Sequence, residues 1–492
     1  MAVETEIKLS LPPRAASGLD KHPLLAGSKP LRQRLLNTYY DTPDLRLQRE
    51  RIAVRYRKKG GQWLFTVKCA APSAGGLARR NEWEVPGLPG EFDFSHVDDK
   101  KLRYLLESLR TELTPAFTTD FMRNAWIIEP KAGIRIELAL DRGWIESNGR
   151  RAPICEVELE LLEGNVDALF TAASALQTDL PLHPEVASKA ERGYRLFTDT
   201  APAPAKALPV KIDGDLSASA AFASVAHACL NQLQTNERGL HESDDPEFVH
   251  QARVAIRRLR SAIRAWKPLL PTAFVADFDP RWRTLAAALG DTRNRDVFIT
   301  ETLPSLADAF PAHPEIDRLA QHAIRRNVIS RKRARRTFKA ADYSCLLLDF
   351  TAAMLALPDS AEPPLKDFAR SCLSKRAKHV TKQATVAHQA DAAARHRLRV
   401  KLKRLRYALE FFAPLFPGQH MQRYHLAAAK LQDLLGHMND LVVAMHFTKE
   451  ALPARKAEFI GHWLEEKNSL LQQELKHSLA DFLKQKAPWK HR

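Results

Sequence analysis

The chain has 492 residues, of which 45% are hydrophobic and 27% are charged, so collagen-like, coiled-coil-only and wholly disordered classes fit poorly. Its length allows about two to four domains. The net charge of +17 is uneven: residues 1–200 hold 29 basic and 28 acidic side chains, and residues 201–492 hold the remaining 46 and 30. This asymmetry predicts two parts with different partners.

The sequence carries no signal for secretion or for a membrane span. The N-terminal MAVETEIKLS has carboxylates where a secretory signal needs basic residues and then an apolar run, and no apolar run of about 18 residues follows. The five cysteines are scattered, without CxxC pairs, which predicts free thiols and a cytoplasmic location. The Gly-Lys dipeptide, GxSxG and HExxH are all absent, which excludes a Walker A loop and two hydrolase motifs.

The first 200 residues consist mostly of short segments with alternating polar and apolar side chains. These segments predict strands at 4–9, 52–57, 63–68, 81–85, 133–141 and 154–162. The period becomes helical at 99–109 and 166–176. A Pro- and Ala-rich stretch without periodicity predicts a linker at 201–216, which separates a first domain at 1–200 from a second at 217–492.

The second domain contains only helical patterns, and it contains an internal repeat. HQARVAIRRLRSAIRAW begins at His250 and HRLRVKLKRLRYALEFF begins at His396, an offset of 146 residues. The same offset aligns Gly290 of LAAALGDTRNRDV with Gly436 of LQDLLGHMNDLVV. These matches predict a duplicated helical bundle with copies at about 250–298 and 396–443, each built from about four helices.

Charged side chains recur at a spacing of two along the predicted strands, so each set shares one strand face. The sets are Glu4, Glu6 and Lys8; Arg55 and Arg57; Glu82 and Glu84; Arg135, Glu137 and Asp141; and Glu156, Glu158 and Glu160. A solvated outer face explains any single set. Several sets, some basic and some acidic, favour a closed or cupped sheet with a polar interior. Such an interior suits phosphate, held by Arg and Lys, together with a hard divalent ion held by carboxylates.

Six motifs in this region carry a family resemblance. They are ExExK at Glu4-Glu6-Lys8, YYDTPDLRL from Tyr39, AVRYRKKGGQWLFTVK from Ala53, IELALDRGWI from Ile136, CEVELELLEG from Cys155 and SKAERGYRL from Ser188. Together they resemble a CYTH domain, which belongs to the triphosphate tunnel metalloenzymes. That superfamily includes inorganic triphosphatases, thiamine triphosphatases and class IV adenylate cyclases.

The resemblance implies an eight-stranded antiparallel β-tunnel that binds triphosphate inside. Carried over by motif, the phosphate-gripping residues are Lys8, Arg55, Arg57, Lys68, Arg123 and Lys189. The implied ligands for Mg²⁺ or Mn²⁺ are Glu4, Glu6, Glu156 and Glu158, with Asp141 nearby. Glu82 and Glu84 match a further family position, Glu160 leaves the register of its run open, and Lys8 has the alternative of a structural pair with Glu4 or Glu6. Phosphoanhydride cleavage needs charge neutralisation and an oriented water more than a covalent nucleophile.

Basic side chains form one continuous stripe on a helix in each copy of the repeat. The first stripe is His250, Arg253, Arg257, Arg260 and Arg264, and the second is His396, Arg399, Lys403 and Arg406. No acidic residue lies between 250 and 267 or between 395 and 409, so an anionic partner would offset the repulsion between like charges. The stripes therefore predict polyanion binding on an exposed face, with plain solvated surface as the alternative.

The repeated HxxRVxxRRLR and GDTRNRD motifs resemble a CHAD domain. That family is helical and duplicated, occurs behind CYTH domains, and is associated with inorganic polyphosphate. The second copy departs from the first at Glu410, which stands where the first has Arg264, and in its shorter acidic motif at Asn439-Asp440. RKRARR at 331–336 has no partner in the repeat and is interpreted as a solvated face.

These patterns predict an α+β chain in which an antiparallel eight-stranded β-tunnel precedes an all-α duplicated helical bundle. The predicted function is metal-dependent hydrolysis of inorganic triphosphate, with polyphosphate bound by the basic helices. The alternatives are thiamine triphosphate hydrolysis, cyclisation of ATP, or a non-enzymatic polyphosphate or nucleic-acid adaptor. The basic stripes lack interleaved aromatic residues, which argues against nucleic acid as the partner.

Overall fold

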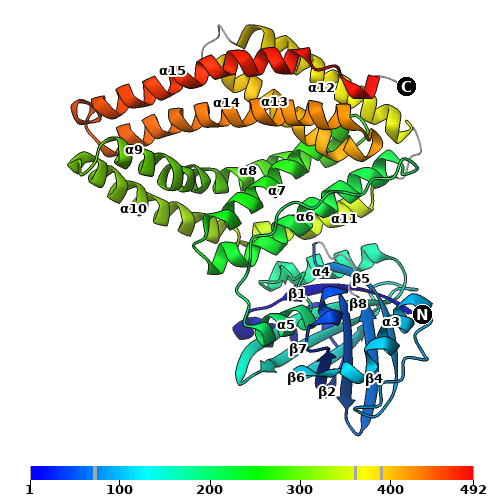
Figure 1. Cartoon of the computed structure of the whole chain (residues 1–492). Helices are drawn as coiled ribbons and strands as arrows, with labels where there is room; N and C mark the ends of the chain where they lie inside the picture. Colours follow the sequence, from blue (N-terminus) through cyan, green and yellow to red (C-terminus); the bar gives the residue numbers. More distant parts are fainter. Residues whose placement is uncertain (1, 70–74, 359–362, 388–391, 491–492) are drawn as a thin grey trace. The chain divides into compact units, whose positions relative to one another are not determined.

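The structure is a computed structural model, and it describes residues 2–69, 75–358, 363–387 and 392–490 (Figure 1). The chain forms two compact units. The first consists of Met1–Ala203 together with Lys339–Ala356, and the second of Pro204–Phe338 together with Leu357–Arg492. Residues 200–213 contain neither helix nor strand. Each unit has its own hydrophobic cores.

Eight antiparallel strands form a closed barrel in the first unit (Figure 1). They are β1 (Ala2–Ser10), β2 (Leu31–Asp41), β3 (Ile52–Lys59), β4 (Gln62–Cys69), β5 (Leu77–Pro86), β6 (Thr114–Ile128), β7 (Arg135–Ser147) and β8 (Arg150–Glu163). The order is β5-β4-β3-β2-β6-β7-β8-β1, and β1 pairs with β5 to close the ring. A two-residue strand, β9 (His183–Pro184), adds to β1. The predicted eight-stranded antiparallel tunnel is confirmed.

The barrel is polar inside because its outer surface is covered by apolar packing. Ile7 and Leu9 of β1 lie fully buried in one core with Leu169 of α4 (Val166–Asp179). A second core joins the strands β3 to β5 to Leu106 of α3 (Lys100–Leu109). Strand alternation then directs the intervening charged residues into the barrel, where an eight-stranded ring has room for side chains or for one small ligand.

Short helical segments complete the first unit. They are η1 (Pro13–Ala15), α1 (Ala16–Leu19), η2 (Pro23–Leu25), α2 (Arg46–Arg49), η3 (Arg110–Glu112) and α5 (Lys189–Thr198). Helix α5 packs closely against β6 and β7, and Gly193 makes the approach possible, because an added Cβ would overlap the ring of Phe117.

One helix of the first unit comes from far along the sequence. Helix α11 (Ala341–Leu355) packs against α4 and β9, and its Leu348 is fully buried in the core that contains Ile7 and Leu169. The sequence division at 201–216 did not anticipate this contribution, because α11 reads as one more helix in an all-helical region.

The second unit is helical, and its described helices follow the internal repeat. They are α6 (Ala218–Glu242), α7 (Pro246–Trp266), α8 (Thr272–Val297), α9 (Leu303–Ala309), α10 (Pro314–Thr337), α12 (Leu365–Ala387), α13 (Ala392–Phe412), α14 (Gln419–Ala451) and α15 (Ala454–Lys484), with short turns η4 (Phe298–Thr302), η5 (Ala413–Leu415) and η6 (Pro488–Lys490). Both ends of α7 and α13 differ by the predicted 146 residues. Helix α11 lies between the two copies in sequence and belongs to neither. Among the described helices, none is long and apolar enough to cross a bilayer.

Candidate active site and basic helical cluster

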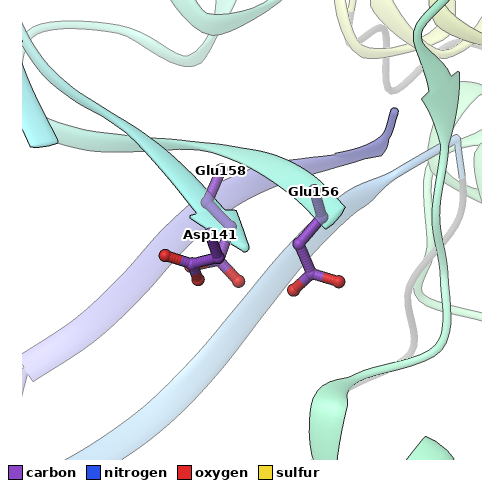
Figure 2. A group of neighbouring side chains, drawn as sticks. All are labelled: Asp141, Glu156 and Glu158. Carbon is purple, nitrogen blue, oxygen red and sulfur yellow. The ribbon is translucent and has the colours of Figure 1, made fainter. Parts of the chain in front are cut away.

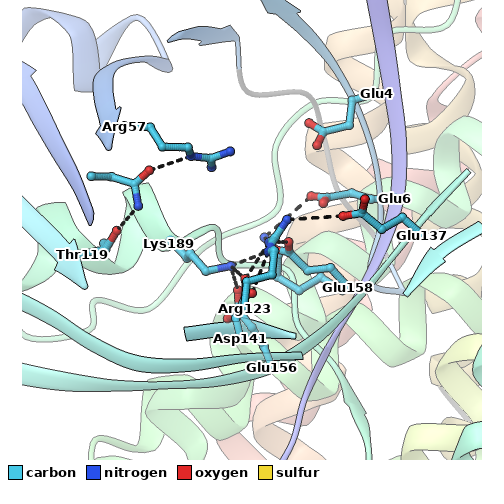
Figure 3. Close-up of polar contacts among 12 residues, drawn as sticks. Glu4, Glu6, Arg57, Thr119, Arg123, Glu137, Asp141, Glu156, Glu158 and Lys189 are labelled. Carbon is cyan, nitrogen blue, oxygen red and sulfur yellow. Dashed lines mark hydrogen bonds and ion pairs between the residues drawn. The ribbon is translucent and has the colours of Figure 1, made fainter. Parts of the chain in front are cut away.

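Charged side chains from the strands of the barrel meet Lys189 of α5 in its interior (Figure 3). Strand pairing puts predicted site residues directly opposite one another: Lys8 faces Glu158, Asp141 faces Glu156, and Arg123 faces Asp141. The spacing of two in the sequence therefore produces a compact group of alternating charges in the fold.

Three carboxylates form the densest part of this group (Figure 2). One oxygen each of Asp141, Glu156 and Glu158 lies within 4.8 Å of the others, and the first two residues are fully buried. Burial alone would raise the pKa of Glu158, but Lys189, Arg123 and Lys8 hold it well below its usual value. Glu158 thus remains anionic at neutral pH.

Lys189 and Arg123 each pair with more than one carboxylate of this cluster. Lys189 Nζ lies 2.7 Å from Asp141 Oδ2 and 2.9 Å from Glu158 Oε1, and it also pairs with Glu156. Arg123 donates to both oxygens of Asp141, at 2.8 and 2.7 Å, and also to Glu158. Ser188 and Glu191 cap α5 reciprocally, which fixes Lys189 at the first helical position.

The donor set of this cluster fits a hard divalent cation. All of its candidate ligand atoms are carboxylate oxygens, which Mg²⁺ and Mn²⁺ prefer over nitrogen or sulfur. Among the described residues, no other group of this kind is found.

The other two predicted metal ligands lie apart from the cluster. Glu4 pairs with Lys68 at 2.8 Å, and Glu6 lies 3.2 Å from Arg80 and 3.7 Å from Lys8. Glu160 sits among carboxylates: burial, Glu4 and Glu137 raise its pKa to about 7. The five predicted ligands therefore form a group of three and two separately paired side chains.

The remaining predicted phosphate-binding residues line the same interior. Arg55 is buried 3.6 Å from Glu82, and its Nη1 donates to the Tyr39 hydroxyl at 3.3 Å. Lys68 also pairs with Glu82, at 2.7 Å. Arg57 lies 3.8 Å from Glu84 and donates to Asn37 at 2.9 Å. All six predicted cations thus surround one space, as do Glu82 and Glu84.

Two further cations in the tunnel were missed by the sequence reasoning. Arg80 pairs with Glu6, and Arg192 Nη1 donates to Glu156 at 2.8 Å. Both carried a usable signal: Arg80 stands two residues before Glu82 on the same strand face, and Arg192 stands one helical turn after Lys189.

In the second unit, the two residues that follow the histidine of each stripe come together in one cluster. Arg253 and Arg257 of α7 lie close to Arg399 and Lys403 of α13, and all four are partly buried. Burial and the charges of Arg257 and Arg399 lower the pKa of Lys403 to about 5. Among the described residues, the buried Nε atoms of Arg253 and Arg399 have no hydrogen-bond partner. We call these four residues the basic cluster.

The rest of the stripe residues have other surroundings. Arg260 and Arg264 both pair with Asp279 of α8, at 3.0 and 3.1 Å. Arg406 donates to Gln432 at 2.9 Å, and His396 is exposed. His250 is partly buried, and burial and Arg293 lower its pKa to about 4.

Two expectations about the basic helices were wrong. Of the stripe residues only His396 is exposed, because α7 and α13 pack together and this packing reduces the solvent exposure of the other stripe residues. The RKRARR segment is not wholly solvated. Arg331 is buried and lies 2.7 Å from Asp296. Arg335 donates to the carbonyl oxygens of Leu240 and Ser243 at the C-terminal end of α6.

Comparison with known proteins agrees with this architecture. The family model of the CYTH domain matches residues 2–194, and that of the CHAD domain matches residues 224–449. An inorganic triphosphatase of Haemophilus influenzae is 34% identical over 202 residues, which are 40% of this chain and 55% of that protein, so the chain spans about half the length of this relative.

Two solved structures show similarity to separate parts of the chain. The CHAD domain of Ricinus communis is 29% identical, covers 57% of this chain and 97% of its own, and has a TM-score of 0.48. A Hippeastrum adenylyl cyclase candidate with a dominant triphosphatase activity is 18% identical, covers 40% and 97%, and has a TM-score of 0.30. On the two family matches, this chain contains a CYTH domain at residues 2–194 and a CHAD domain at residues 224–449.

Proposed function

We propose that the tunnel hydrolyses inorganic triphosphate, or tripolyphosphate, to pyrophosphate and phosphate in a metal-dependent reaction. The observation that carries this proposal is the meeting of the Asp141–Glu156–Glu158 cluster with Lys8, Arg123 and Lys189 inside a closed barrel. The 34% identity of this region to an inorganic triphosphatase supports the same substrate.

The residues of the tunnel have separate parts in this reaction. Arg55, Arg57 and Arg123 present planar guanidinium groups, which bind phosphate oxygens in pairs, and Lys8, Lys68 and Lys189 add point charges. The carboxylate cluster would hold Mg²⁺ or Mn²⁺, and a bound ion would neutralise phosphate charge. The fixed cations stabilise charge that develops on the phosphate oxygens as the anhydride bond breaks.

The tunnel favours a purely inorganic substrate over thiamine triphosphate or ATP. Trp126 and Trp63 are strand residues whose rings could in principle stack on an organic group. Trp126 is buried in the core outside the barrel, and Trp63 packs against another core, as expected from their strand positions. Thiamine triphosphate hydrolysis and ATP cyclisation remain the alternative activities.

For the helical unit we propose inorganic polyphosphate as the ligand of the basic cluster. The partly buried guanidinium groups of Arg253, Arg257 and Arg399 repel one another and gain from a polyanion that lies across α7 and α13. Nucleic acid fits less well, because Tyr407, which lies under Arg257 and Arg406, is itself buried and offers no stacking face.

A phosphate-release assay on the full chain tests the tunnel proposal. Tripolyphosphate, thiamine triphosphate, ATP and pyrophosphate are each supplied with Mg²⁺, Mn²⁺ or EDTA. We expect tripolyphosphate to give the highest kcat/KM and EDTA to abolish turnover. A kcat/KM for thiamine triphosphate tenfold larger than that for tripolyphosphate would favour thiamine triphosphate hydrolysis as the activity. Full activity in EDTA would contradict the metal requirement.

A further inference from the structure

Helix α11 packs against α4 and β9 of the first unit, although it lies outside both copies of the repeat. It belongs to the first unit, while the residues before and after it along the chain belong to the second. Two sets of contacts connect α11 to the backbone of Lys8.

The first set passes through two glycines with positive φ. Gly75 (φ +59°) lies against α11 so closely that an added Cβ would overlap Thr351 Oγ1 and lie 3.2 Å from the Leu347 carbonyl oxygen. Its neighbour Gly76 accepts a hydrogen bond from the Lys8 backbone N–H at 3.0 Å. A side chain at either glycine would strain the backbone. At Gly75 it would also overlap Thr351 of α11, and at Gly76 it would crowd the Lys8 carbonyl oxygen, 2.8 Å from the added Cβ.

The second set passes through β9. Ser344 of α11 lies 2.8 Å from Nδ1 of His183, whose strand pairs with Leu9 and Ser10 of β1. Glu185, the residue directly after β9, donates its backbone N–H to the Lys8 carbonyl oxygen at 2.9 Å. Both backbone groups of Lys8 are therefore bonded to segments that α11 contacts.

Apolar packing fixes α11 in this place. Leu348 is fully buried among Ile7, Leu9 and Leu169, on the opposite face of β1 from Lys8. Thr351 is also fully buried. The helix thus supports β1 from the outside, at the point where Lys8 enters the tunnel.

We propose that α11 is a positioning element for Lys8, so that the tunnel is completed by a helix encoded inside the helical half of the sequence. In this role Leu348 and Ser344 act through β1 and β9 and do not touch the substrate. The effect on turnover rests on the proposed triphosphatase activity, whereas the mechanical coupling between α11 and β1 does not.

The test compares three variants of the full chain. Leu348→Ala removes the buried contact, Ser344→Ala removes the contact to His183 with little loss of volume, and Leu355→Ala is the control because that leucine on the same helix is exposed. Hydrogen exchange is followed in peptides spanning residues 5–10 and 183–187. We expect Leu348→Ala and Ser344→Ala to accelerate exchange there by about tenfold or more, and Leu355→Ala to change nothing.

Kinetics on tripolyphosphate supply the second measurement. We expect Leu348→Ala to raise KM by about tenfold with a smaller change in kcat, because Lys8 binds phosphate before and during the reaction, and Leu348→Met to restore KM. If the two variants exchange faster but the wild-type protein has no triphosphatase activity, the proposed function is wrong and the coupling between α11 and β1 remains. Unchanged exchange and unchanged KM in Leu348→Ala and Ser344→Ala, with an active wild type, would overturn the proposal itself.

Discussion

Asp141 and Glu156 are fully shielded from solvent. Burying a carboxylate is unfavourable unless it is paired, and here Lys189, Arg123 and Arg192 lie within hydrogen-bond distance of the two side chains. The carboxylate cluster is therefore preformed, and a bound divalent ion would replace basic side chains as the partners of the carboxylates.

Glu156→Gln tests the cluster at the level of one oxygen. The substitution keeps the shape and removes one charge, so we expect kcat for tripolyphosphate to fall by about 100-fold or more, equivalent to about 3 kcal/mol. The Mg²⁺ concentration for half-maximal activity should rise as well. Glu163→Gln is the matched control, since Glu163 ends the same strand and is exposed. A Glu156→Gln enzyme with wild-type kcat would contradict the assignment.

Lys403 predicts a pH dependence of stability in the helical unit. Its folded pKa of about 5, lowered by burial and by Arg257 and Arg399, lies far below the unfolded value of about 10.4. Between these values the unfolded chain binds the extra proton, so this residue makes the fold more stable as pH rises. Lys403→Met should therefore raise Tm, and its advantage over wild type should shrink from pH 6 to pH 9.

Differential scanning calorimetry at pH 6, 7.5 and 9 measures this difference. Lys430→Met serves as the control, because Lys430 is exposed on α14. Its Tm difference from wild type should not vary with pH. A Lys403→Met difference that is constant or that grows with pH would mean that Lys403 stays charged in the fold.

At the scale of single elements, sequence periodicity predicted most strands and helices, together with the interior face of the barrel. It placed Lys8, Arg55 and Glu156 correctly because a strand has only two faces and the outer one is apolar. It could not predict which charges on a helix are neutralised from elsewhere. Asp279 pairs with Arg260 and Arg264 from a neighbouring helix, and that pairing depends on tertiary packing.

The two halves of α7 should consequently bind a polyanion with different strength. We expect Arg257→Gln to weaken polyphosphate binding and to reduce the slope of log affinity against log salt by about one, by analogy with the counterion release known for DNA. Arg260→Gln removes an equal charge from the same helix, but Asp279 already neutralises that charge, so its effect should be much smaller. Polarisation titrations of the full chain at several salt concentrations compare the two. Equal effects would contradict a site at the basic cluster.

At the scale of the whole molecule, the two units are expected to unfold as separate cooperative systems. Trp489 gives a specific test, because it is fully buried, donates from Nε1 to Ser374 Oγ at 3.0 Å and packs on Tyr424. Trp489→Ala should destabilise the helical unit by about 3–5 kcal/mol and leave the tunnel unit in place.

Calorimetry and metal-dependent turnover together show whether the two units unfold separately or as one system. We expect one transition of Trp489→Ala to move to lower temperature while tripolyphosphate hydrolysis at 25 °C persists. Trp144→Ala is the control, since that side chain is 47% exposed, and it should alter neither transition by more than about 0.5 kcal/mol. A joint shift of both transitions by Trp489→Ala would show that the chain unfolds as one system.

The place of α11 in the sequence also affects the order in which the protein is made. The first unit is built from two sequence segments, Met1–Ala203 and Lys339–Ala356, and residues 204–338 between them belong to the second unit. At roughly 5–20 residues per second, a ribosome needs about 10–30 s to reach the end of α11 after finishing the strands and helices of the tunnel. During that interval α4 and β1 lack their cover by Leu348. The nascent barrel therefore exposes an apolar face while the first copy of the helical repeat is translated. Chaperone binding at that face would be confined to this interval.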